Sequence, residues 1–181
     1  MNAELLGEGL YFGEGPRWHD GKLWFSDFYD HAVKTVDSEG NIATMLEIAG
    51  QPSGLGWLPD GNLLVVSMLD RRVLRLDDDE LVVHADLSDL AEFHCNDMVV
   101  DAVGRAYVGN FGFDLDAAQH SDDFVGALKA YQGATLARVD PDGSVHVAAT
   151  ALQFPNGTVI TPDGRTLIIA ESLASRLTAF D

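Results

Sequence analysis

The stretch "EFHCNDMVV", residues 92–100, places a histidine, a cysteine, an asparagine and an aspartate side by side. These residue types could build a nucleophilic centre or a metal site, and the same stretch could equally be a turn that leads into a strand. Cys95 is the single cysteine of the chain, and a thiolate nucleophile needs a base within hydrogen-bond reach. Because no recognisable sequence motif supplies that base, we expect Cys95 to be a small buried thiol. The chemistry of this stretch then depends on His94, Asn96 and Asp97.

Four segments of the chain repeat one pattern, in which an apolar strand is followed by a tight turn with glycine and a second apolar strand. They are "GPRWHDGKLWFSD", "SGLGWLPDGNLLVVS", "NDMVVDAVGRAYVGN" and "NGTVITPDGRTLIIAES". The turn glycines are Gly21, Gly61, Gly104 and Gly164. Asp-Gly between apolar strands predicts type I′ hairpins, which need a positive φ at both central residues. A further strand in each repeat ends in aspartate, at Asp37, Asp77, Asp140 and Asp181.

Four antiparallel strands in each unit of about 40 residues are typical of β-propeller blades. We therefore predict an all-β fold, with residues 1–181 forming a single, partial β-propeller domain of about four four-stranded blades. The insertion at 112–133 starts polar and then suits a short helix, and we expect it to overhang one mouth of the channel. Residues 2–12 resemble an outer strand without its own blade, and the fourth repeat lacks its outer strand. The open edge of such an arc leads to two expectations. Either the chain is a portion of a longer propeller, or a second copy of the chain associates with the open edge.

One position recurs just before the first strand of every unit. In chain order it holds Glu14, Ser53, Asn96 and Asn156. The first strand of a propeller blade is the innermost, so equivalent positions of different blades face one central channel. A carboxylate and two carboxamides offer oxygen ligands that suit Ca²⁺, Mg²⁺ or Mn²⁺, and Zn²⁺ also accepts carboxylate oxygen. The competing interpretation is local, because asparagine favours turns and Asn156 in "FPNG" could serve the turn alone.

Alternation of side chains along a strand divides the residues of the opening stretch between two faces. His94 shares the face of Asn96, so it could contact a substrate, carry a proton or simply line the channel. Cys95 and Asp97 are expected on the opposite face, away from Asn96.

Three stretches resemble the SMP-30/gluconolactonase/luciferin-regenerating family: "GEGPRW" around Glu14, "CNDMVVDAVGR" around Asn96 and "FPNGTVITPDGRTLIIAES" around Asn156. The resemblance covers the whole chain and implies a regucalcin-like six-bladed β-propeller, here C-terminally incomplete, with one divalent cation in the channel. It implies that Glu14 and Asn156 are metal ligands and that Asn96 binds metal or substrate. It also implies a further aspartate, both ligand and general base, in a blade beyond residue 181. His94 departs from the family pattern, in which an arginine that contacts substrate is common at this position.

The resemblance implies a divalent-metal-dependent hydrolase of the gluconolactonase type, which opens a lactone of a sugar or a related small molecule with metal-activated water. Glu14, Asn96 and Asn156 are the predicted metal ligands, and His94 and Asn96 the predicted substrate-binding residues. The cation expected first is Ca²⁺, with Mg²⁺, Mn²⁺ and Zn²⁺ as alternatives. The alternative function is a propeller that binds a metal or a ligand without turnover, or an interaction scaffold.

The charge balance of the chain narrows the choice of partners. Twenty-nine acidic and eleven basic side chains give a formal net charge of −18, which repels phosphate, so we expect neither nucleic acid nor membrane as a partner. The N-terminal residues lack the basic and apolar regions of a signal peptide, and no apolar run is long enough to cross a membrane. We therefore expect a cytoplasmic protein whose partner is a small-molecule lactone.

Overall fold

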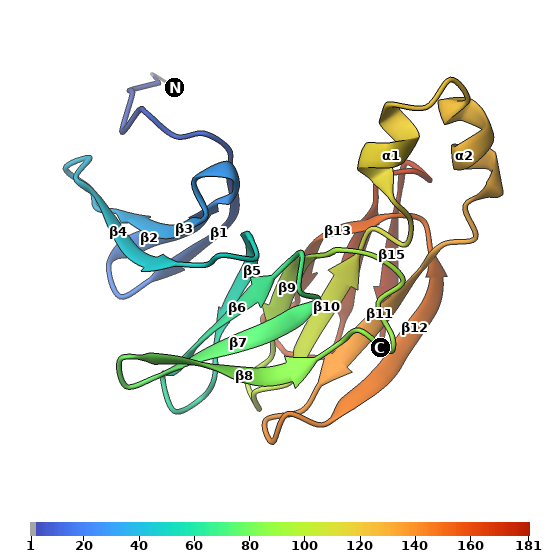
Figure 1. Cartoon of the computed structure of the whole chain (residues 1–181). Coiled ribbons are helices and arrows are strands. Elements are labelled where there is room, and N and C mark those ends of the chain that lie inside the picture. Colours follow the sequence, from blue (N-terminus) through green and yellow to red (C-terminus); the bar gives the residue numbers. More distant parts are fainter. Residues whose placement is uncertain (1–2) are drawn as a thin grey trace.

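The computed structural model of the protein describes residues 3–181. Over these residues, consecutive strands form four antiparallel sheets, which are the blades of a β-propeller arc (Figure 1). The first blade contains β1 (Gly13–His19), β2 (Lys22–Asp27), β3 (Ala32–Val36) and β4 (Ile42–Glu47). The second contains β5 (Pro52–Trp57), β6 (Leu63–Ser67), β7 (Arg72–Asp77) and β8 (Glu80–Asp86). The third contains β9 (Cys95–Val100), β10 (Ala106–Asn110), β11 (Ala134–Val139) and β12 (Val145–Leu152), and the fourth contains β13 (Pro155–Ile160), β14 (Leu167–Glu171) and β15 (Arg176–Phe180).

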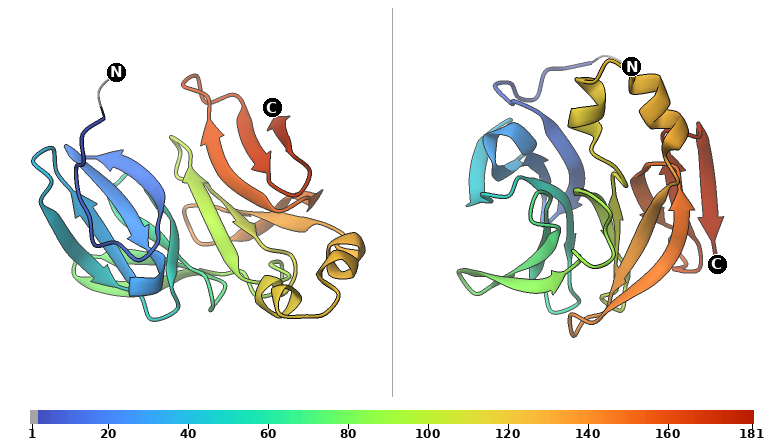
Figure 2. Two further views of the ribbon diagram at one scale, coloured as in Figure 1. Left: turned by 90° about the horizontal axis from the view of Figure 1, so that it is seen from above. Right: turned by 45° about the vertical axis from the view of Figure 1, so that its right-hand side comes forward.

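The four first strands lie side by side along the inside of the arc, in the order β1, β5, β9 and β13. Seen from above, the first and fourth blades stand at the two ends of an open arc (Figure 2). The predicted all-β propeller with about four blades is confirmed. Because the first strands are neighbours, residues far apart in the sequence meet at the inner side of the blades.

The turn between β1 and β2 has the predicted geometry, with positive φ at Asp20 (47°) and Gly21 (75°). The prediction is wrong at the other three hairpins, where only the glycine has a positive φ. In the β5–β6 hairpin, for example, Gly61 N donates to Leu58 O and Leu58 N donates to Asn62 O. This is a type I turn followed by a glycine bulge, which also matches the twist of the strands it joins.

Apolar side chains fill the space between neighbouring blades. Between the first and second blades Val33, Leu55 and Val65 are fully buried, and each such side chain contributes about 1.5–3 kcal/mol relative to exposure. Close approach of the second and third blades depends on Gly54 in β5, since a Cβ there would lie 2.3 Å from Met98 N in β9. Any larger residue would push the inner strands apart.

The segment before β1 differs from the prediction of an outer strand over residues 2–12. Residue 2 lies outside the described residues, and no strand is assigned in residues 3–12. The reason is that this segment crosses the end of the first blade, where Tyr11 N and Phe12 N donate to the Asp27 carboxylate. Its backbone therefore pairs with a side chain instead of with a neighbouring strand.

The remaining short elements are helical. The 3-10 helix η1 (Phe28–Asp30) follows β2, and the insertion at 112–133 contains α1 (Leu115–Gln119) and α2 (Phe124–Ala130), instead of a single short helix. Each of the two α-helices begins at an aspartate that caps it, with Asp114 accepting from Ala117 N and Asp123 from Gly126 N, both at 2.8 Å. No helix in residues 3–181 has the length and apolar character needed to cross a membrane.

Candidate active site in the propeller channel

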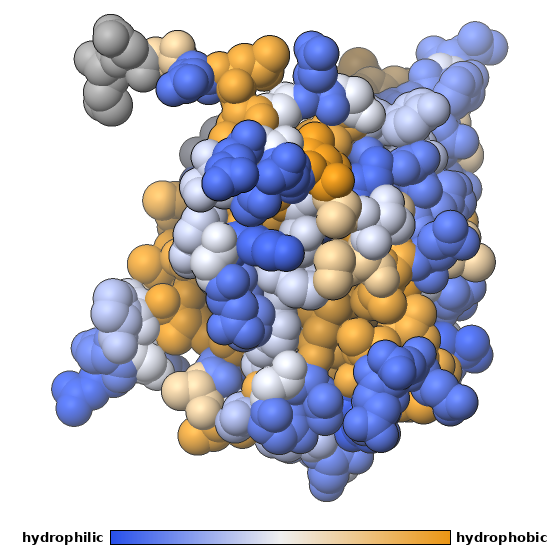
Figure 3. Space-filling view, turned by 90° about the vertical axis from the view of Figure 1, so that its left-hand side faces the viewer, coloured by the Kyte–Doolittle hydropathy of each residue, from blue (hydrophilic) through white to orange (hydrophobic). Residues whose placement is uncertain are grey.

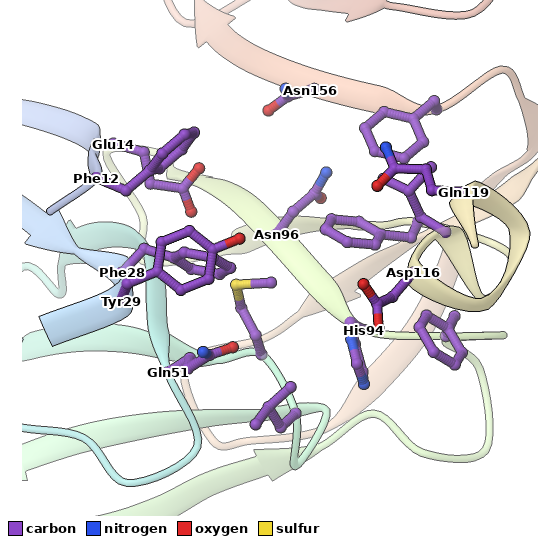
Figure 4. A pocket seen from close by; sticks show the side chains of 16 residues that line it. Phe12, Glu14, Phe28, Tyr29, Gln51, His94, Asn96, Asp116, Gln119 and Asn156 are labelled. Atoms are coloured by element: carbon purple, nitrogen blue, oxygen red, sulfur yellow. The ribbon is translucent and has the colours of Figure 1, made fainter. Parts of the chain in front are cut away.

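The four channel positions occupy the same place in the structure, since each is the second residue of an inner strand. Glu14 lies in β1, Ser53 in β5, Asn96 in β9 and Asn156 in β13. Glu14, Asn96 and Asn156 line one cavity of about 500 Å³, which Figure 4 shows from close by. Three residues separated by about 60–80 positions in the chain thus share one site, because the propeller geometry repeats the strand in each blade.

Ser53 stands behind Glu14, and its hydroxyl donates a hydrogen bond of 2.5 Å to Oε1 of Glu14. Burial raises the pKa of the Glu14 carboxyl above 4.5, the hydrogen bond from Ser53 lowers it, and the negative charge of Asp97 raises it again. The net effect is a raised pKa, so the surroundings disfavour the charged carboxylate. A bound cation would offset this penalty.

The amide of Asn96 is the best-defined group of the site. Its side chain is 3% exposed, and its Nδ2 donates to the carbonyl oxygen of Pro155 at 2.8 Å. That hydrogen bond leaves Oδ1 buried and without a hydrogen-bond partner among residues 3–181. Buried polar atoms are paired in most proteins, so a lone carbonyl oxygen beside a cavity indicates a donor or a cation in the working state.

The cavity offers oxygen donors of the kind that a divalent cation requires. Glu14 supplies a carboxylate, and Asn96 and Asn156 supply amide oxygens, which are ligands for hard cations. Within residues 3–181, no three His, Cys, Asp or Glu side chains form a cluster suited to a metal ion. A cation here would therefore be held mainly by neutral oxygens, which the unpaired Oδ1 of Asn96 fits.

Asp97 does not line the cavity. The regular alternation expected from the sequence is interrupted here, because the register of β9 with β10 shifts between Cys95 and Met98. Oδ1 of Asp97 lies 3.0 Å from Nη2 of Arg17, and its Oδ2 accepts from Thr158 N at 2.8 Å. The carboxylate therefore joins β1, β9 and β13, and Asn96 and Asp97 both bond to the backbone of β13. The sequence predicted no role for Asp97, since its partners are 80 and 61 residues away.

Cys95 is fully buried within the apolar core of the second and third blades. Burial raises the pKa of its thiol to about 12, so the thiolate that a nucleophile needs is strongly disfavoured. The prediction of a small buried thiol is confirmed.

His94 lines the cavity two residues before Asn96, and the same offset in the other blades also reaches the cavity. These residues are Phe12, Gln51, His94 and Phe154. Burial lowers the pKa of His94, which favours the neutral imidazole near pH 7. Of these four residues, only His94 was predicted from the sequence. Applying the repeat alignment two positions earlier would have identified the other three.

A third set of lining residues directly follows the second strand of its blade, and it comprises Phe28, Met68 and Phe111. The insertion adds Leu115, Asp116 and Gln119 from α1 at the mouth of the cavity. The insertion therefore contributes directly to the cavity, as expected from its position in the sequence. Sequence reasoning named none of these six residues.

Residues 12–181 match the family described as "SMP-30/Gluconolactonase/LRE-like region". The chain belongs to this family. A pentonolactonase of Haloferax volcanii is 27% identical over 165 residues, which are 90% of this chain and 50% of the relative. The resemblance seen in the sequence is confirmed at the level of the family.

Solved structures share the propeller architecture at low sequence identity. A gluconolactonase of Xanthomonas campestris superposes with a TM-score of 0.76 at 22% identity, over 97% of this chain and 60% of that one. Regucalcin of Agrobacterium tumefaciens, a calcium-binding protein, gives 0.71 at 22% identity, over 95% of this chain and 55% of that one. A chain of a nidogen/laminin complex also gives 0.71, at 15% identity, over 93% and 60%. The chain thus spans about half to three fifths of the length of these relatives.

Proposed function

We propose that the protein is a divalent-metal-dependent lactonase of the gluconolactonase type, whose site is the cavity of Glu14, Asn96 and Asn156. The observation that carries the proposal is the buried, unpaired Oδ1 of Asn96 in the same cavity as the Glu14 carboxylate. Family membership supports a lactone as substrate, and the Haloferax relative is named a pentonolactonase. The reaction adds water to the carbonyl carbon and breaks the ring C–O bond, which gives a hydroxy acid.

The cation we propose is Ca²⁺, because two amide oxygens and a single carboxylate form a weakly charged oxygen site. Mg²⁺, Mn²⁺ and Zn²⁺ are the alternatives that metal analysis would distinguish. When bound, such a cation polarises a carbonyl oxygen and lowers the pKa of water. Glu14 and Asn156 would hold it together with Oδ1 of Asn96.

The side chains of the site have separate tasks in this proposal. Ser53 fixes the direction of the Glu14 carboxylate through the 2.5 Å hydrogen bond, and Pro155 O fixes the Asn96 amide. Fixed ligands lose little freedom when the reaction begins, which is the basis of preorganised sites. His94 and Asn96 border the space where the lactone ring would lie, and they position it for attack.

The test is the variant Glu14→Gln, which keeps the size of the side chain and removes its charge. We expect Glu14→Gln to bind the cation at least about tenfold more weakly and to lose lactone hydrolysis by about two orders of magnitude. Metal content by mass spectrometry and hydrolysis in a pH-stat are the measurements. The matched control is Glu80→Gln at the exposed first residue of β8. Equal metal content and equal activity in wild type and Glu14→Gln would reject the site.

The second candidate is a propeller that binds a ligand without turnover, or a scaffold. This candidate is supported by the fold, which is similar to that of a chain in a nidogen/laminin complex, with a TM-score of 0.71. The propeller fold is thus found in proteins other than enzymes. In the described part of the chain, the carboxylates that line the cavity are Glu14 and Asp116, and the Asp116 side chain is 87% exposed. Cation binding that depends on Glu14, without hydrolysis of any lactone, would select this candidate.

A further inference from the structure

The cavity is layered along the channel. Its floor consists of the polar side chains of Glu14, Asn96 and Asn156. The first and second strands of a blade pair antiparallel, so the start of the first strand lies beside the end of the second. Cys95 at the start of β9, for example, pairs with Asn110 at the end of β10. The residues that precede the first strand and those that follow the second therefore lie at the same end of the blade. The second and third sets of lining residues therefore form a wall between the polar floor and the mouth.

One side of this wall is an aromatic cluster at the first blade. The rings of Phe12 and Phe28 lie 5.7 Å apart, and those of Phe28 and Tyr29 lie 4.4 Å apart. Phe12 is 52% exposed and Tyr29 is 60% exposed. Aromatic surface left open to water at a cavity is available to an apolar ligand.

The opposite side of the wall is a second aromatic cluster, from the third and fourth blades. Phe111 stacks on Phe154 with ring centroids 5.0 Å apart, and His94 meets the edge of Phe111 at 6.2 Å. Figure 4 shows Phe12, Phe28 and Tyr29 on one side of the cavity, together with Glu14, and His94 on the other side, with Asn96 between them. The two clusters flank the polar floor as two faces of a slot.

Apolar side chains make up most of this wall. Its polar groups are Gln51, His94 and the hydroxyl of Tyr29, and Asp116 and Gln119 stand on α1. A sugar lactone buries several hydroxyls, and each needs a hydrogen-bond partner to avoid a desolvation cost. An alkyl or aryl group needs only apolar surface, which Phe12, Phe28, Met68, Phe111 and Phe154 supply.

We propose that the preferred substrate is a lactone whose ring carries an apolar substituent, with the ring carbonyl at the polar floor and the substituent between the two aromatic clusters. This inference rests on the proposed lactonase function and names its substrate class. It departs from the expectation of a sugar lactone. The aromatic wall discriminates between lactones, because it buries an apolar substituent. The polar floor contacts the lactone ring, which is the same in every substrate.

The experiment compares three six-membered lactones on the full chain with its cation: δ-valerolactone, which has no substituent, δ-decalactone, which carries a pentyl chain, and glucono-δ-lactone, which carries hydroxyls. Each buried methylene is worth about fourfold in binding. We therefore expect kcat/KM for δ-decalactone to exceed that for each of the other two by at least about tenfold. A higher kcat/KM for glucono-δ-lactone would overturn the inference and leave the lactonase proposal standing.

The variant Phe154→Ser separates the wall from the floor. We expect it to lower kcat/KM for δ-decalactone at least about tenfold, and to lower that for δ-valerolactone several-fold less. Phe154→Leu should recover most of the difference between the two lactones. The exposed Val83→Ser in β8 controls for substitution as such, and thermal unfolding reports whether each variant is folded. An equal loss for both lactones in Phe154→Ser would contradict the inference.

If no lactone is hydrolysed, the lactonase proposal fails. The affinities of the two lactones for the cavity then still show whether the site prefers an apolar ligand. Calorimetric titration of Glu14→Gln and of the wild type with δ-decalactone and δ-valerolactone then measures the preference directly. Binding of δ-decalactone at least about tenfold tighter supports an apolar ligand at the wall. Equal binding, or none, overturns it.

Discussion

The Asn96 side chain in the channel is held by neighbours that contribute no ligand themselves. Oδ1 of Asn96 lies against Gly109 in β10, where a Cβ would come within 2.6 Å of it. The same Cβ would lie 3.1 Å from Pro155 O, the acceptor of the Asn96 amide. Because Gly109 has no side chain, it leaves room for Oδ1 of the Asn96 amide.

We expect Gly109→Ala to displace the Asn96 amide, to lower stability by about 1–3 kcal/mol and to weaken cation binding by about tenfold. Calorimetric titration with Ca²⁺ and urea unfolding measure the two effects. The control Gly13→Ala makes the same change where the nearest atoms to the Cβ are 3.5 Å and 3.8 Å away. Equal cation affinity in Gly109→Ala and wild type would show that Oδ1 of Asn96 is not a ligand.

The ends of the second strands carry a structural repeat of their own. The last residue of β2, β6, β10 and β14 is buried and polar, and these residues are Asp27, Ser67, Asn110 and Glu171. The Asp27 carboxylate accepts from Phe12 N, and Glu171 accepts from Gln153 N, directly before Phe154. These two carboxylates therefore hold the segments that carry the aromatic wall.

Glu171 gives a prediction for the pH dependence of stability. Hydrogen bonds from Arg176 are the largest influence and, together with those from Gln153 N and Thr178, lower the pKa of Glu171 from 4.5 to about 2, against the effect of burial. A carboxylate with a lowered folded-state pKa stabilises the fold fully above about pH 4.5, and loses that contribution as the pH falls towards 2.

We expect Glu171→Gln to destabilise the protein by about 2 kcal/mol at pH 7, because charge-assisted hydrogen bonds are lost. The difference from wild type in urea unfolding should shrink as the pH falls from about 4.5 to 2. A difference that stays constant over this range would assign the effect to packing and not to charge.

The two ends of the arc differ in exposure, because the N-terminal segment partly covers the outer sheet face of the first blade and the outer sheet face of the fourth blade is open. On the first blade an apolar groove of about 270 Å³ is lined by Leu10, Leu23 and Phe25 among others. On the fourth blade Val159 and Leu177 are 58% and 74% exposed. Figure 3 views the molecule from the side of the first two blades, and hydrophobic side chains there lie in several separate areas among hydrophilic ones. Exposed apolar sheet faces favour association.

We predict that the chain of residues 1–181 associates with itself as its concentration rises, which light scattering measures. Burial of each exposed Val or Leu is worth about 1.5 kcal/mol or more. The double variant Val159→Lys, Leu177→Lys should therefore weaken association at least about tenfold. Val83→Lys, at a residue 55% exposed on the outer strand of the second blade, is the matched control. A monomer over a wide concentration range would contradict the prediction.

Much of this architecture is local and was therefore readable in the sequence. Apolar alternation, turn glycines and a strand pattern repeated in each unit identify a propeller, because each is a property of a few adjacent residues. The repeat alignment also brought Glu14, Asn96 and Asn156 to one channel position. The local geometry was less well predicted, since the glycine bulge at Gly61 and the strandless segment before β1 depend on hydrogen bonds that the residue types alone do not specify.

The cavity itself depends on contacts between blades. The Ser53–Glu14 hydrogen bond spans 39 residues and the Asn96–Pro155 hydrogen bond spans 59. Neither can be predicted from the residues adjacent to it in the sequence. The aromatic wall arises in the same way, because Phe111 and Phe154 come from different blades and meet only after the blades pack. The repeating sequence specified which residues face the channel, through the period of the strand. Packing of the blades decided which of them touch, because distance across the channel is a property of the assembled arc.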